Sequence, residues 1–324
     1  MLKLCLKAAA LLLCILAPIL LVSGEKEPQN QVQIPQSTTV LLLGKDDASG
    51  LADFVALFNL DTEQNSVMLV QIPRDTYISI PNARYKKLNG AAKLLGSENE
   101  LCALLSESMG IDIDGFVAFD SRFVKEVVDL LGGVELTVPM DMDYEDPYQK
   151  LSIHLKKGKQ RLNGEQAVGF VRYRKGYLRA DIGRGDAQKI FLSALAKTTL
   201  ERVGKKDILP LARLALRYVK TDLPIDRLVS LGGSMGKLTP ENLCFATMPG
   251  EEVKSQESGA WFYLLSRSGC KELLECLDGG EFDKGHIYSD AQRTEFEEIY
   301  NKDVKARIYN AAEIDGEGID ITPK

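Results

Sequence analysis

Basic side chains gather in one short stretch of this chain. Between Arg172 and Lys189 there are six cations against two acids, although the whole chain has a net charge of −6. Arginine suits phosphate and carboxylate groups, because its planar guanidinium donates two parallel hydrogen bonds and stays charged at physiological pH. The stretch contains Arg172, Arg174 and Arg184 and therefore predicts an anion-binding site. If a helix begins after Gly183, its free backbone N–H groups would strengthen that site.

Carboxylates and a further arginine lie upstream, beside apolar runs that are typical of buried strands. Asp46 and Asp53 flank the ends of two such runs, and Arg74 and Asp75 follow a third. Carboxylate oxygens are good ligands for Mg²⁺, which takes its remaining ligands from water and phosphate. Together with the basic stretch, these residues predict a site for a metal-bound pyrophosphate.

Several of these residues also have a purely structural explanation. Asp46 can be an ordinary turn residue, and Arg74 and Asp75 can form a surface ion pair of little energetic value. Arg172 and Arg174 are harder to explain in this way. On a strand they would point to the same face and repel each other unless an anion bridged them.

Alternating apolar runs and amphipathic segments supply the elements that must position these side chains. We expect strands at 38–43, 54–60, 66–72, 116–119, 134–138, 151–155 and 242–248, and helices at 87–109, 121–131, 163–171, 186–203 and 208–218. This alternation predicts an α/β fold with layered α/β/α architecture around a mostly parallel or mixed central sheet. Ligands bind such sheets at the carboxyl ends of the strands, where residues 44–53 and 73–75 should fall.

The N-terminal segment differs from the rest of the chain. Residues 8–22 are all apolar, with two lysines before them and Glu25 and Glu27 after them. We expect residues 1–23 to form a membrane anchor with a cytoplasmic N-terminus and an external body. Alternatively, the small residues at 22–24 resemble the cleavage site of a secretory signal. Either interpretation exports the body and excludes cytosolic ATP as the phosphate donor.

The remaining chain divides into three parts by composition. Residues 24–36 are polar, contain two prolines and predict a linker, and residues 37–280 carry the expected strands and helices. Residues 281–324 are polar and weakly patterned, so we expect a C-terminal tail with at most one helix.

Residue usage argues against several other functions. His154 and His286 are the only histidines, so a Ser-His-Asp triad or a histidine-built zinc site is not expected. No Walker pattern occurs, and the localised basic residues in an acidic chain argue against a nucleic-acid partner. Cys270 and Cys276 can either form a disulfide or remain free thiols.

A series of ordered motifs runs through the predicted domain. They are LLLGKD at 41–46, Asp53, IPRDT at 72–76, KLN at 87–89, GGV at 132–134, LNGEQA at 162–167, RYR at 172–174, DIGR at 181–184 and Gln188. In this order they resemble the LytR-CpsA-Psr family, over about residues 38–250. A membrane anchor ahead of the domain is also typical of that family.

The resemblance implies an enzyme that moves a glycopolymer from a polyprenyl-pyrophosphate carrier to peptidoglycan, outside the bacterial cell membrane. A sugar hydroxyl of the peptidoglycan would attack the sugar-linked phosphate and leave polyprenyl phosphate, whose tail is expected to lie in an apolar channel. In similar proteins, aspartates that match Asp46 and Asp53 hold Mg²⁺.

The resemblance also assigns roles to the basic cluster. Arg74, Arg172, Arg174 and Arg184 match arginines that bind the pyrophosphate, and Gln188 and Asp181 match positions that help them. We expect these arginines to be catalytic by neutralising charge on the phosphate oxygens. Asp75 or Asp181 is expected either to take the proton of the acceptor hydroxyl or to orient an arginine.

The chain departs from the family pattern at two positions. The usual Arg-Ser-Asp is Leu51-Ala52-Asp53 here, which removes one cation near the phosphate, and the arginine usual before Gln188 is Ala187. These changes leave two alternatives to transfer: an exported polyprenyl-pyrophosphate binding or regulatory protein, or hydrolysis of the same lipid by water. The sequence does not identify the glycopolymer.

Overall fold

The computed structural model describes residues 36–46, 49–84, 86–148, 151–177, 180–203, 205–235, 238–256, 258–277 and 296–314. The side chains of Ala180, Asp181 and Lys205 are not among the features described. The predicted anchor, residues 1–23, and nearly all of the linker, residues 24–36, lie outside these ranges. Within them, no helix combines the length and the hydropathy that crossing a bilayer requires.

A seven-stranded sheet forms the centre of the domain, in the order β13-β10-β3-β2-β1-β4-β9. Its strands are β1 (Ser37–Lys45), β2 (Ala52–Asp61), β3 (Ser66–Gln71), β4 (Gly115–Asp120), β9 (Lys220–Thr221), β10 (Leu243–Thr247) and β13 (Ile308–Asn310). The prediction of a mixed sheet is confirmed, but the expectation that most strands are parallel is wrong. Only β1 with β4 and β3 with β10 run parallel, and the other neighbours in this order are antiparallel. Short turns rather than helices join β1, β2 and β3, and such turns connect antiparallel strands.

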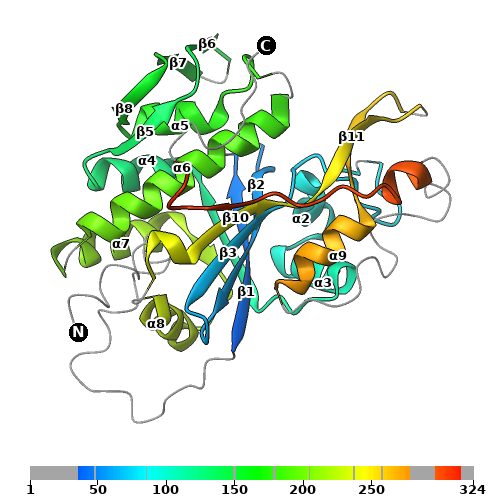
Figure 1. Cartoon of the computed structure of the whole chain (residues 1–324), viewed down its shortest axis with the longest axis horizontal. Helices are drawn as coiled ribbons and strands as arrows, with labels where there is room; N and C mark the ends of the chain where they lie inside the picture. The colour runs from blue at the N-terminus through cyan, green and yellow to red at the C-terminus, as the bar shows by residue number, and fades with distance from the viewer. Residues whose placement is uncertain are drawn as a thin grey trace.

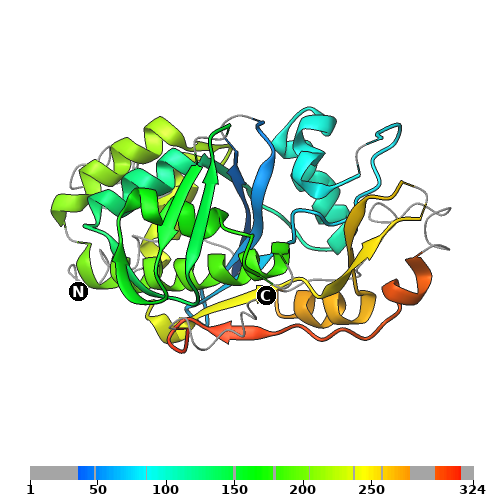
Figure 2. The same ribbon diagram turned by 90° about the horizontal axis from the view of Figure 1, so that it is seen from above.

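Helices and small sheets cover the two faces of the central sheet (Figures 1 and 2). One layer holds the helices α4 (Ser121–Leu130), α5 (Gly164–Arg172), α6 (Ala180–Arg202) and α7 (Lys205–Tyr218). The same layer contains two pairs of antiparallel strands. In the first, β5 (Val134–Val138) pairs with β8 (Gly158–Leu162), and in the second, β6 (Met142–Asp146) pairs with β7 (Leu151–Leu155). The other layer holds α2 (Ala91–Leu95), α3 (Glu98–Met109), α9 (Arg267–Glu275) and the pair β11 (Gly250–Lys254) with β12 (Trp261–Leu265). The short elements η2 (Leu88–Gly90), α8 (Ile225–Ser234) and η4 (Pro240–Asn242) complete the set. The predicted α/β class with helices on both faces is thus confirmed.

The apolar run of β1 explains why this strand lies at the centre. Val40 and Leu42 pack into the core on one face, and Leu41 and Leu43 pack into the core on the other. A strand that is buried on both faces has a continuous apolar sequence rather than an alternating one. The sequence of β1 therefore requires layers on both sides of the sheet.

The C-terminal residues 296–314, predicted as part of a tail, pack against the domain. β13 pairs with β10 at the edge of the central sheet, and the side chains of Phe296 and Tyr300 are buried. Ser266, which caps α9, donates a hydrogen bond to the carbonyl oxygen of Lys302 at 2.6 Å. In Figure 1 this segment runs across the front of the sheet beside β10.

The four cysteines in the described ranges are free, namely Cys102, Cys244, Cys270 and Cys276. Cys270 and Cys276 could have formed a disulfide or remained free thiols, and they are free thiols in the structure.

Gly269 in α9 tests how tightly the C-terminal segment is packed. A Cβ atom at Gly269 would lie 1.8 Å from the carbonyl oxygen of Val304. We expect Gly269→Ala to lower the free energy of unfolding by about 1–3 kcal/mol, because such overpacking must displace backbone. Denaturant unfolding measures this loss, and limited proteolysis between residues 296 and 314 should accelerate.

The matched control is Gly233→Ala, at an exposed position of α8 with no atom within 4 Å of the added Cβ. This variant should gain roughly 0.5–1 kcal/mol from its higher helix propensity. Equal unfolding free energies for the two variants would show that the segment is not packed as described.

Candidate active site

Sheet topology brings the predicted site residues to one edge. β1 and β3 are both antiparallel to β2 and therefore run in the same direction, and β4 and β10 run parallel to them. The carboxyl ends of these four strands thus share an edge with the beginning of β2. Asp46 follows β1, Asp53 lies at the start of β2, and Arg74 follows β3.

Asp53 reaches the site because of an irregularity in the β1–β2 ladder. Gly44 pairs with Phe54 and Lys45 pairs with Ala52, so Asp53 is the extra residue of a bulge. A bulge bends its strand and redirects the side chain of the extra residue. The apolar sequence around Asp53 is therefore compatible with a carboxylate that points toward the arginines.

A tight loop between β1 and β2 holds Asp46. Its backbone N–H donates to the carbonyl oxygen of Leu51 at 2.8 Å, and its Oδ1 accepts hydrogen bonds from the backbone and the hydroxyl of Ser49 at 2.8 and 2.9 Å. Asp46 is thus a turn residue, which was the structural alternative to a role in metal binding. Its second oxygen, Oδ2, lies 3.8 Å from Arg172 Nη2 and so links this loop to the arginines.

Arg172 and Arg174 lie at the end of a helix, not on a strand. Arg172 is the last residue of α5, Tyr173 is its C-cap, and Arg174 opens the turn that follows, in which the Tyr177 N–H donates to the Arg174 carbonyl oxygen at 3.2 Å. The expectation that a strand aligns the two arginines is therefore wrong. The helix pattern of 163–171 continues for one more residue, and the buried ring of Tyr173 fixes the chain between the two guanidiniums.

Arg184 also lies inside a helix, because α6 already begins at Ala180. The prediction that Gly183 and Arg184 precede a helix and offer its N–H groups is wrong. A Cβ on Gly183 would lie 2.6 Å from atoms of Tyr177, so the glycine instead permits close packing. The Arg184 side chain is 4% exposed.

Three arginines converge on the two aspartates. Arg74 Nη1 lies 2.5 Å from Asp53 Oδ1, and Arg174 Nη2 lies 3.9 Å from the same oxygen. Arg172 Nη2 lies 3.8 Å from Asp46 Oδ2. The network therefore carries more positive than negative charge, and the side chains of Asp46 and Asp53 are still 25% and 31% exposed. An anion from solvent can enter it.

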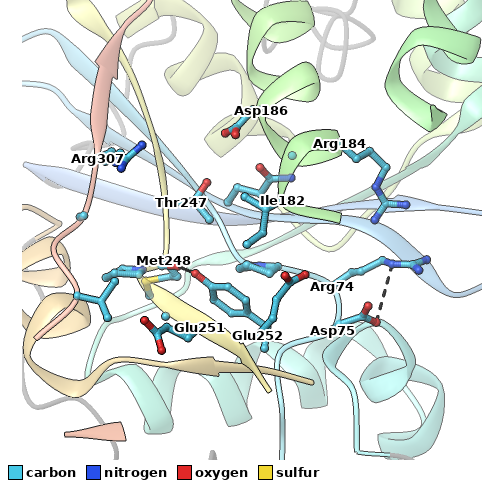
Figure 3. A pocket seen from close by; sticks show the side chains of 18 of the residues that line it. Arg74, Asp75, Ile182, Arg184, Asp186, Thr247, Met248, Glu251, Glu252 and Arg307 are labelled. Atoms are coloured by element: carbon cyan, nitrogen blue, oxygen red, sulfur yellow. Dashed lines mark hydrogen bonds and ion pairs between the residues drawn. The ribbon is translucent and has the colours of Figure 1, made fainter. Parts of the chain in front are cut away.

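Asp75 supports cations rather than standing free. Its Oδ1 accepts a hydrogen bond from Lys87 Nζ at 3.0 Å and lies 3.9 Å from Arg74 Nε, as the dashed line in Figure 3 shows for Arg74. Of the two roles predicted for Asp75, this geometry matches the one in which it orients an arginine. Lys87 is a site residue that we did not predict, although its KLN motif was among the signals.

Gln188 lies behind the arginines and joins two elements of the site. Its Oε1 accepts a hydrogen bond from Gln71 Nε2 at 2.6 Å, and its Nε2 donates to the carbonyl oxygen of Val171 at 3.3 Å. Gln188 thus ties β3 to the residue before Arg172. We did not predict Gln71 as a site residue. The available signal was a polar residue near the end of an apolar run.

Two pockets meet at this edge. The smaller, of about 260 Å³, is lined by Arg172, Arg174, Lys175 and Arg184 with Asp53, Tyr144 and Leu151. The larger, of about 790 Å³, also includes Asp53 and Arg184 and extends past Arg74 toward β11, β12 and residues 302–309 (Figure 3). The side chain of Asp181 lies outside the described features, so its predicted role stays a prediction.

The sequence profile of the LytR_cpsA_psr family matches residues 21–278. This chain belongs to the LytR-CpsA-Psr family. The predicted resemblance is therefore confirmed, and the motifs that carried it include the residues now seen at the sheet edge. The profile ends before the segment 296–314.

Curated relatives and solved structures agree with this membership. The chain is 27% identical to the polyisoprenyl-teichoic acid–peptidoglycan teichoic acid transferase TagV of Bacillus subtilis (strain 168), over 74% of this chain and 63% of TagV. It is 27% identical to the similarly named TagU of Bacillus cereus (strain AH820), over 78% of this chain and 80% of TagU. The crystal structure of B. subtilis TagV superposes with a TM-score of 0.64 at 25% identity, covering 76% of this chain and all of that one. TagT bound to LIIa-WTA shares the fold, with a TM-score of 0.61 at 23% identity over 78% and 96% of the two chains.

The two departures from the family pattern differ in their structural context. Ala187 lies on the face of α6 that is fully buried in the core, where an arginine side chain would not fit without displacing its apolar neighbours. Leu51 closes the loop that holds Asp46, and it therefore removes a cation from the site itself.

A buried glutamate anchors the strand that leads to Asp46. Glu98 at the start of α3 is 5% exposed and pairs with Lys45 of β1 and, at 2.8 Å, with Lys220 of β9. Burial raises the pKa of Glu98, but the hydrogen bonds from Lys220 and Lys45 lower it by more, to about 2. Because the folded pKa is below the ordinary value of 4.5, this carboxylate stabilises the fold.

The pH dependence of stability tests this anchor. The contribution of Glu98 is complete above its unfolded pKa, near 4.5, and is lost as the pH falls toward about 2. We expect Glu98→Gln to lower the free energy of unfolding most at about pH 6, and its difference from the unmodified protein to shrink toward about pH 2.5. Denaturant titrations at the two pH values measure this difference.

Glu126→Gln, at an exposed position of α4, serves as the control and should change stability little at either pH. A Glu98→Gln deficit that is the same at both pH values would contradict an ionised Glu98 as the cause.

Proposed function

We propose that this chain is a transferase that moves an anionic glycopolymer from a polyprenyl-pyrophosphate carrier to peptidoglycan. The observation that carries the proposal is the convergence of Arg74, Arg172 and Arg174 on Asp46 and Asp53, with Arg184 in the same pocket. The names of the curated relatives support this choice of donor and acceptor. The predicted anchor would place the domain outside the cell membrane, as a single-pass protein.

The cationic pocket explains how the chain would promote this reaction. The acceptor hydroxyl attacks the sugar-linked phosphorus, the bond from that phosphorus to the bridging oxygen breaks, and polyprenyl phosphate leaves with the electron pair. Such phosphoryl transfer depends mainly on alignment and on neutralising the charge that spreads over the phosphate oxygens. The arginines supply that charge, and Asp75 and Gln188 position them.

The proton of the acceptor hydroxyl needs a nearby base. Asp75 already accepts from Lys87, and Asp53 lies against Arg74, so both carboxylates have a cation beside them. Asp181 remains the alternative predicted from the sequence. A base role for Asp181 is therefore part of the proposal, and a base role for Asp75 requires that Lys87 release its carboxylate when substrate binds.

Asp46 and Asp53 are suited to hold Mg²⁺ in this site. They offer partly exposed carboxylates, 25% and 31% exposed, at one sheet edge. Within the described ranges no group of three or more His, Cys, Asp or Glu side chains is suited to a metal. Mg²⁺, however, commonly takes only one or two carboxylates, with water and substrate phosphate completing its shell. When bound, it would neutralise further phosphate charge.

Removal of single arginines tests the pyrophosphate site. In the full-length protein we expect Arg172→Ala and Arg174→Ala each to weaken binding of undecaprenyl pyrophosphate by roughly 10- to 100-fold, because each loses charge-assisted hydrogen bonds worth about 1.5–3 kcal/mol. Titration of detergent-solubilised protein with the lipid measures the affinity.

Arg213→Ala, at an exposed position of α7 outside both pockets, is the control and should bind normally. Unchanged lipid binding in both Arg172→Ala and Arg174→Ala would overturn the proposed site.

Leu51 favours a second candidate, an exported lipid-pyrophosphate binding protein without transfer activity. The cation that this position lacks would lie in the loop that carries Asp46. A single-turnover assay with lipid-linked glycopolymer and peptidoglycan separates the candidates: lipid retained without polymer transfer favours the binding protein. Phosphate release without any acceptor would reveal hydrolysis.

A further inference from the structure

The larger pocket has a wall that lies beyond the family profile. The profile ends at residue 278, whereas Lys302 to Arg307 and Tyr309 line one side of this pocket of about 790 Å³. The opposite side is formed by Arg74, Asp75 and Arg184, and Figure 3 shows Arg307 across the pocket from them. A ligand that fills the pocket would therefore touch both the phosphate site and the C-terminal segment.

The charge of this wall favours an anionic ligand. Lys305 and Arg307 are exposed, and neither has an ion-pair partner among the described residues. Three of the acids that line the pocket already have partners: Asp186 accepts from Lys189 at 2.6 Å, Glu251 pairs with Lys302 at 2.5 Å, and Asp303 accepts a hydrogen bond from Ser268 Oγ at 3.2 Å. The cations of Lys305 and Arg307 therefore remain available to a ligand.

The other lining groups favour a sugar over a lipid chain. Trp261 is 58% exposed at the rim, and an aromatic face can stack on the apolar face of a pyranose. Gln71 and Thr247 lie on adjacent strands and line the pocket, and Gln71 Oε1 and Thr247 Oγ1 are buried without a hydrogen-bond partner among the described residues. Polar side chains in the wall make it a poor seat for an alkyl chain, which cannot hydrogen-bond them.

We propose that this pocket is a subsite for an anionic glycan, in which Trp261 stacks on a sugar ring and Lys305 and Arg307 bind carboxylate or phosphate groups. The inference rests on the proposed function, because it places the glycan beside the phosphate that is transferred. Two glycans have the required chemistry: the phosphate-bearing donor polymer and the carboxylate-bearing peptidoglycan acceptor.

Trp261 makes the subsite directly observable, because it is the only tryptophan in the chain. Full-length protein in detergent is titrated with a soluble disaccharide-peptide fragment of peptidoglycan, with poly(N-acetylglucosamine 1-phosphate), and with undecaprenyl pyrophosphate, while tryptophan emission is recorded. We expect at least one of the two glycans to shift the emission in a saturable manner. The double variant Lys305→Glu/Arg307→Glu should need about tenfold more of that glycan, as expected for the loss of about 1.4 kcal/mol.

The control reverses two equally exposed charges on α7, Lys206→Glu/Arg213→Glu, and should titrate like the unmodified protein. A response to the peptidoglycan fragment identifies an acceptor subsite, and a response to poly(N-acetylglucosamine 1-phosphate) identifies a donor subsite. No emission shift with either glycan, or equal titrations for the two double variants, overturns the inference.

The lipid titration distinguishes a failure of this inference from a failure of the proposed function. Lipid affinity is measured by a direct binding assay. Undecaprenyl pyrophosphate should bind the Lys305→Glu/Arg307→Glu variant as it binds the unmodified protein. If the lipid affinity fell as much as the glycan affinity, the wall would belong to the pyrophosphate site and the subsite would be wrong. If the unmodified protein did not bind the lipid at all, the proposed function would fail, whatever the glycans did.

Discussion

The ion pairs of Asp53 are the interaction on which the rest of the site depends. Three guanidinium groups near one another repel, and Asp53 and Asp46 provide the negative charge that lets them stay close. Asp53 can do so only because a bulge releases it from the β1–β2 ladder. On the proposed function, an incoming pyrophosphate would offer the arginines new partners, and the two carboxylates would then be available to a magnesium ion.

The sheet provides the precision that this exchange requires. Because β1 and β3 run in the same direction, Asp46 and Arg74 emerge at one edge although 28 positions separate them. Gln188 then fixes the end of α5 to β3 through Gln71, so the helix that carries Arg172 cannot shift independently of the sheet. Glu98 performs a related task on β1 by binding lysines from two strands. Two elements that lead into the site, β1 and α5, are thus each held by a second polar contact.

Local signals in the sequence predicted much of the fold but not the pairing of its strands. The apolar runs and helical patterns placed β1, β2, β3 and α5 within a few residues, because burial on both faces leaves a direct mark on composition. Strand direction depends on how the strands are connected. The overall alternation of strands and helices predicts parallel neighbours, whereas the short turns between β1, β2 and β3 require antiparallel ones. The packing of residues 296–314 was not predicted for a different reason: β13 has three residues, and its position at the sheet edge comes from contacts with β10 and α9.

The site residues were predictable as a set, whereas their supports were not. Arginine and aspartate motifs identify the anion chemistry, but Gln71 and Lys87 act through contacts that no spacing reveals. The same distinction bears on specificity. On the proposed function, phosphate chemistry is common to any lipid-linked donor, and the residues proposed to bind it lie within the family profile, whereas the cationic wall at Lys305 and Arg307 lies outside it. A pocket built in this way can keep one reaction while its glycan changes, because residues that touch only the sugar can vary without disturbing Asp53 and its arginines.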